Sequence, residues 1–153
     1  MVFDQLKFAR SKTLKLIEVT DDSLYDVIPE GFRNHIWWNV GHLYVIQEMI
    51  IFGGAGEAPN LAGDLSSFFG NGAKPESWNS QPPSVADLQL LLQEQTGRIK
   101  ETFENRLDER LEKPLQIGEL SLPTIRDLIT FTLFHEGLHL ETMKVYRRLL
   151  TKD

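Results

Sequence analysis

Apolar residues recur with helical spacing in four segments, at residues 3–19, 34–53, 84–111 and 124–150. A period near 3.6 residues places these side chains on one face of a helix, so each segment predicts a long amphipathic helix. Asn34 is the candidate N-cap of the second helix, which should end at Gly53. Residues 114–122 alternate between apolar and polar and predict a short extended turn. The pattern predicts an all-α four-helix bundle.

The second and third predicted helices are separated by a long connection. Residues 55–83 are rich in Gly, Pro, Asn and Ser and have no helical period. A connection of this length inside a compact domain is either functional or disordered. Its aromatic residues Phe68, Phe69 and Trp78 favour an ordered loop that packs on the helices, either over a functional site or over the core.

Three of the four histidines lie where the apolar face of a predicted helix continues. His42 is in the second helix, and His135 and His139 are in the last. A separation of four residues turns a helix by about 400°, so His135 and His139 share one face at chelating spacing. One inward histidine is usually a hydrogen-bonded core residue. Three together predict a shared divalent metal site with open coordination positions, and imidazole ligands favour zinc or nickel.

Further polar residues lie near these histidines in the sequence. Glu136 is close enough to act as a general base and is the candidate catalytic residue; the alternatives are a solvated glutamate or a partner that orients a histidine. Asn39, one turn before His42, is a candidate partner of an imidazole or an internal packing amide. His35 is too far from His42 along the helix to share an ion and is expected at the helix start. Tyr146 is expected in the core.

Composition excludes several classes of protein. The chain has 153 residues and no cysteine, so disulfides, thiolate metal sites and a cysteine nucleophile are excluded. A net charge of −6 with scattered basic residues argues against a general nucleic-acid binder. No signal peptide or membrane-length apolar run is recognised. These features predict a single cytoplasmic domain over residues 1–153.

The segment 135–139 also matches the H-E-x-x-H pattern of zinc metalloproteases. In such enzymes two helical histidines hold zinc and the glutamate activates water. The rest of the chain does not support this interpretation, because no predicted strand offers an edge to a peptide substrate.

A larger combination of motifs covers nearly the whole chain. Residues 38–43, Trp-Asn-Val-Gly-His-Leu, are followed by the long connection, by Leu-Pro-Thr-Ile-Arg-Asp at 122–127 and by the histidine pair. This combination resembles the DinB/YfiT-like superfamily. The resemblance implies a four-helix bundle with a divalent metal held by one histidine of helix two and an H-x-x-x-H pair of helix four. These positions correspond to His42, His135 and His139.

The resemblance also implies two kinds of chemistry on a small-molecule substrate. Some family members are similar to transferases that use a low-molecular-weight thiol, and many are described as metal-dependent hydrolases. The alternative is a bundle that binds a structural metal or a small ligand without catalysis. Family members often pair, and the apolar side chains of Phe8 and Trp37 would otherwise be exposed, so a homodimer is expected.

Overall fold

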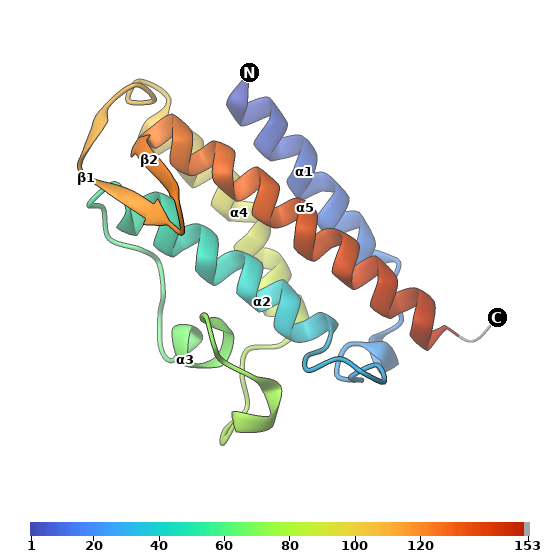
Figure 1. Cartoon of the computed structure of the whole chain (residues 1–153). Helices are drawn as coiled ribbons and strands as arrows, with labels where there is room; N and C mark the ends of the chain where they lie inside the picture. Colours follow the sequence, from blue (N-terminus) through green and yellow to red (C-terminus); the bar gives the residue numbers. More distant parts are fainter. Residues whose placement is uncertain (152–153) are drawn as a thin grey trace.

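The computed structural model describes residues 1–151 as a mostly helical protein with a small two-stranded sheet (Figure 1). The last two residues of the predicted domain, 152–153, lie outside the described part. The longer elements are α1 (Val2–Glu18), α2 (Ile36–Gln47), α4 (Val85–Phe103), β1 (Arg110–Ile117), β2 (Leu120–Thr124) and α5 (Ile125–Leu150). Across residues 1–151, the helices are too short or too polar to cross a membrane.

The long helices bury their apolar faces against one another. α1 packs against α4 and α5, and α2 also packs against α4 and α5. In Figure 1 the β1–β2 hairpin lies at the end of the molecule where α5 begins, and α3 (Leu65–Phe69) lies beside α2. Side chains of α2 are buried almost all round, which is the expected state of a helix covered on several sides.

The predicted helices are present, but the N-cap of α2 is not Asn34. The N-cap is His35, whose Nδ1 accepts a hydrogen bond from the backbone N–H of Trp38 at 3.0 Å. This confirms His35 as a helix-start residue. The side-chain oxygen of Asn34 instead accepts hydrogen bonds from Asn39 and Tyr146. At its other end, α2 continues into a π-helical segment, Glu48–Gly53, and helical structure ends at Gly53 as predicted.

The prediction was wrong at the end of the third long helix. α4 stops at Phe103 rather than near residue 111, and Arg110–Ile117 pairs antiparallel with Leu120–Thr124. Gly118, at φ 60°, lies in the turn between the strands, where a left-handed conformation suits glycine. Strand pairing therefore overrides helical propensity here, and the protein is not purely α-helical.

The long connection is ordered and packs on the helices, as its aromatic residues predicted. Phe68 and Phe69 of α3 are buried, and Trp78 donates a hydrogen bond from Nε1 to the carbonyl oxygen of Phe68 at 3.0 Å. A side chain at Gly41 of α2 would overlap the ring of Phe69. The glycine therefore allows α3 to lie close against α2.

A buried arginine connects the four long helices. Arg10 of α1 is 2% exposed, and all five guanidinium N–H groups have acceptors. It bonds both carboxylate oxygens of Glu136 in α5, at 2.8 and 3.2 Å. The other acceptors are the side-chain oxygen of Gln47 in α2 and, in α4, the side-chain oxygen of Gln95 and the Leu92 carbonyl. One side chain thus fixes the helices relative to one another.

Replacing Arg10 by methionine should reduce the free energy of unfolding by about 3–5 kcal/mol, because Glu136 would keep a buried charge without a partner. Urea unfolding measures this change. Lys144→Met removes an exposed ion pair with Glu141 and serves as the control, with an expected loss of about 1 kcal/mol or less. Equal losses in the two variants would show that Arg10 does not hold the helices together.

Candidate metal centre

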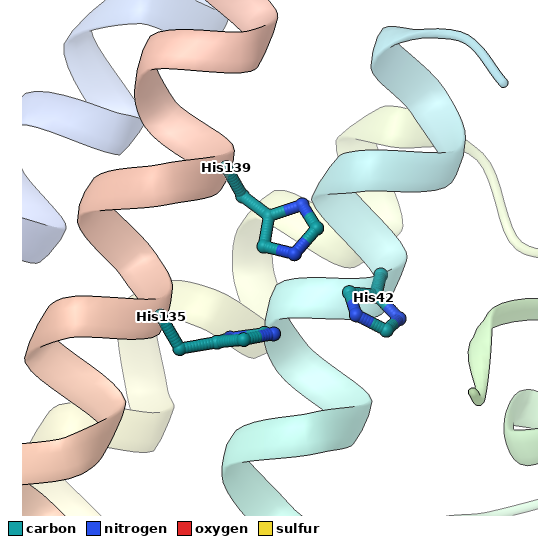
Figure 2. A group of neighbouring side chains, drawn as sticks. All are labelled: His42, His135 and His139. Carbon is teal, nitrogen blue, oxygen red and sulfur yellow. The ribbon is translucent and has the colours of Figure 1, made fainter.

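His42, His135 and His139 lie together between α2 and α5. Figure 2 shows His135 and His139 extending from α5 toward His42 on α2. The centroids of the three rings are 4.5–5.2 Å apart, and one ring nitrogen from each residue lies within 4.8 Å of the others. The structure therefore brings together the histidines that the sequence pattern singled out.

A backbone carbonyl sets the tautomer of His42. The Nδ1 atom lies 2.7 Å from the carbonyl oxygen of Phe69. A carbonyl oxygen only accepts, so Nδ1 carries the proton and Nε2 keeps a free lone pair. The indole of Trp38 stacks on the same imidazole, with centroids 4.4 Å apart and planes 18° apart. The tautomer of His42 is therefore set before any ligand binds, and the indole restrains its ring.

An amide side chain sets the tautomer of His139 in the same way. Its Nδ1 lies 2.7 Å from Oδ1 of Asn39. The Asn39 amide nitrogen donates to the side chain of Asn34 and to the carbonyl of His35, both at 2.9 Å, which fixes Oδ1 as the acceptor. His139 therefore donates from Nδ1 and leaves Nε2 free. Of the two interpretations of Asn39, the structure supports the partner of an imidazole.

The three imidazoles are neutral near pH 7. Burial, together with the smaller effect of the neighbouring imidazoles, lowers the pKa of His135 to about 4 and that of His139 to about 3. Burial also lowers the pKa of His42. Only a neutral imidazole can offer a lone pair to a metal, so the environment holds the ligands in the form that binds.

The donor set fits a divalent metal ion. Imidazole nitrogens about 2.1 Å from one tetrahedral ion lie roughly 3.4 Å from one another. Small rotations of the side chains would bring the three nitrogens to this spacing. Oxygen acceptors on the far side of His42 and His139 are the usual second partners of metal-binding histidines.

His135 also lines a cavity of about 490 Å³. The rest of the cavity wall comes mainly from α2, its π-helical extension and β1. The sequence suggested that Phe68, Phe69 and Trp78 would shape such a pocket, but they pack against α2 and each other instead. From the long connection, Asn71 contributes to the wall. A larger cavity, of about 590 Å³, is lined by residues 53–56 and 112–116 and includes none of the three histidines.

Glu136 lies on a different face of α5 from the histidines. It is 1% exposed, and its carboxylate accepts hydrogen bonds from Arg10 and from the hydroxyl of Thr13 at 2.8 Å, both in α1. The expectation of a solvated glutamate is therefore wrong. Tyr146 is buried as expected, with its hydroxyl on Asn34.

Sequence reasoning missed the Phe69 carbonyl and the partners of Arg10. No side-chain pattern marks a backbone acceptor, so the first had no signal. The partners of Arg10 did have a signal in the sequence, because Arg10 and Gln95 interrupt apolar helix faces. A charge or an amide at such a position needs a buried partner.

Replacing Asn39 by leucine should weaken divalent metal binding about 10–100-fold, because His139 loses the acceptor that fixes its tautomer. Titration with zinc against a competing chelator measures the affinity. Asn79→Leu, in the exposed part of the long connection, is the matched control and should bind as the wild type does. Unchanged affinity in Asn39→Leu would refute the role of this amide.

The metal-free protein should lose stability as the pH falls below about 6.5. His139 stays neutral in the folded state until its pKa of about 3, whereas the unfolded chain takes up the proton near pH 6.5. Between pH 6 and 4 the free energy of unfolding, measured with urea, should therefore fall less steeply in His139→Gln than in the wild type. The difference in slope should reach up to about 1.4 kcal/mol per pH unit. An unchanged slope would mean that His139 titrates normally in the folded protein.

Comparison with known proteins agrees with this geometry. A family model described as the DinB superfamily matches residues 5–143, which include all three histidines. Among curated proteins, the search found no match to this chain. The match spans well over half of the sequence, and the chain belongs to the DinB superfamily.

Proposed function

We propose that the protein is a metal-dependent enzyme that acts on a small molecule, of the hydrolase or thiol S-transferase type. The observation that carries the proposal is the donor set, in which two of three inward imidazoles already have Nδ1 engaged and Nε2 free. A divalent ion held by three neutral ligands keeps its charge and supplies Lewis-acid activation of water or of a low-molecular-weight thiol.

The chain's own residues position the ligands and shape the site. Phe69 and Asn39 hold His42 and His139 in the tautomers that expose Nε2. Trp38 covers one face of His42 and keeps water from that side. His135 lies at the edge of the cavity, where a substrate would meet the centre. The chain has no cysteine, so any thiol chemistry needs a sulfur from a second substrate.

Glu136, which the sequence offered as a general base, has in our proposal a structural role. Both of its oxygens are bonded to Arg10, and one also to Thr13. A base needs a free lone pair directed at the reacting proton. The loss of stability expected for Arg10→Met measures this structural role.

We also propose that the long helices α1, α2, α4 and α5 form the four-helix bundle that the sequence predicted.

The alternative is a metal that only stabilises the fold. Structural zinc sites are usually closed by four protein ligands. Within residues 1–151, the potential ligand group consists of three histidines, which favours an open site and therefore the enzyme.

We expect about one divalent ion per chain in protein prepared without a histidine tag, and a large loss of binding when His42, His135 and His139 are all replaced by alanine. Elemental analysis of zinc and nickel gives the stoichiometry. His35→Ala, which removes a histidine outside the cluster, is the control and should keep the metal. Equal metal content in the triple variant and the wild type would overturn the proposal.

We also expect a homodimer. Phe8 of α1 and Phe134 of α5 are 63% and 62% exposed, and burial of such side chains stabilises association. Trp37, expected to be exposed with Phe8, instead packs on the core and donates to the carbonyl of Pro83. Light scattering should give a dimer mass at micromolar concentration. Phe134→Glu should weaken the dimer, whereas Leu90→Glu on α4 should not; a monomeric wild type would refute the expectation.

A further inference from the structure

We propose that the cavity beside His135 binds the uncharged, aliphatic body of a small molecule, and that β1 determines which molecules fit. This inference rests on the proposed function, because the bound molecule would be the substrate. It concerns the substrate class, which the histidine cluster does not specify.

The chemistry of the wall selects against charge. Most of the lining side chains are apolar, among them Ile46, Met49, Ile50, Ile117 and Phe131. The polar residues of the wall are His135, Asn71 and Gln116. Within the described residues, the wall includes no carboxylate, lysine or arginine. In the metal-free protein a charged group along this wall would lose hydration without gaining a counter-charge, whereas an aliphatic group gains by leaving water.

The cavity begins at His135, one of the three candidate metal donors. Phe131 precedes His135 by one turn of α5, and Ile46 follows His42 by one turn of α2. Ile50 lies a further turn along, so the wall extends roughly 12 Å from the level of His42 at 1.5 Å per residue. A molecule with its polar group near His135 would therefore place an aliphatic chain along this wall. The volume of about 490 Å³ suits a small molecule.

The hairpin contributes three consecutive residues of β1, Leu115–Ile117, to the wall of the cavity. The amide nitrogen of Gln116 donates to the hydroxyl of Ser121 in β2 at 2.9 Å on the exposed face of the hairpin, and the alternation of a strand places Leu115 and Ile117 together on the opposite face. Met49, which is 48% exposed, is flexible and adapts to different aliphatic shapes. The size and polarity of the β1 side chains thus set the size and polarity of the ligand.

The methionines provide a direct test. The chain has three: Met49 in the cavity wall, Met143 buried in the core and Met1 at the exposed N-terminus. NMR of ¹³C-methyl methionine is recorded on the metal-free protein during titration with hexanamide and, separately, with hexanoate. Hexanamide should shift the Met49 signal with saturation and leave Met1 and Met143 in place. Hexanoate should bind at least roughly tenfold more weakly because its charge is desolvated. No shift at Met49, or equal binding of both probes, overturns the inference.

A matched pair of variants tests the role of β1. Ile117→Glu places a charge in the wall, and Leu120→Glu places one on the same hairpin at a residue outside the wall. The first should weaken hexanamide binding by about tenfold or more and the second should not. Equal effects would remove β1 from the proposal.

Cobalt binding, followed by its absorption spectrum, separates the two claims on the same samples. If the protein binds cobalt but not hexanamide, the proposed substrate class is wrong and the proposed function stands. Failure to bind cobalt in a protein that binds hexanamide contradicts the proposed function.

Discussion

The arrangement of helices depends on the hydrogen bonds of the Arg10 guanidinium. These bonds join α1 to α2, α4 and α5. The acceptor in α5 is the buried carboxylate of Glu136, the residue after His135 in the sequence. With Glu136 held toward α1, the helical turn of about 100° per residue directs His135 to another side of α5, where His42 lies. The rotation of α5 is thus set by the same interaction that neutralises the buried charge.

Further buried polar groups add specificity to this core. Gln95 bonds both Arg10 and the buried Glu48, and Glu48 is paired with Arg98 at 2.9 Å. Apolar faces alone would tolerate small changes in helix rotation, because hydrophobic contact has no preferred direction. Hydrogen bonds between buried groups are directional, and a rotated helix would leave them unpaired at considerable cost. Such a core suits a site that needs three side chains from two helices.

The sequence predicted the features that depend on local interactions and missed those that depend on residues far apart in the chain. The positions of His42, His135 and His139 follow from helical periodicity, which is local and strong, and the structure brings them together. The alternation at residues 114–122 predicted extended structure but not a sheet, because strand pairing is non-local, and the start of β1 was assigned to the preceding helix. The partner of Glu136 was missed because it lies 126 residues away, in α1. The cavity beside His135 depends on the hairpin and could not be foreseen without it.

The central claim is an open three-histidine centre, and X-ray absorption spectroscopy of the zinc-loaded protein tests it most directly. The fine structure recognises imidazole ligands by the scattering of their outer ring atoms and gives their number. The account predicts three imidazole nitrogens near 2.0–2.1 Å, with the remaining coordination filled by solvent. A fourth protein ligand with no solvent at the ion, or fewer than three imidazoles, would contradict it.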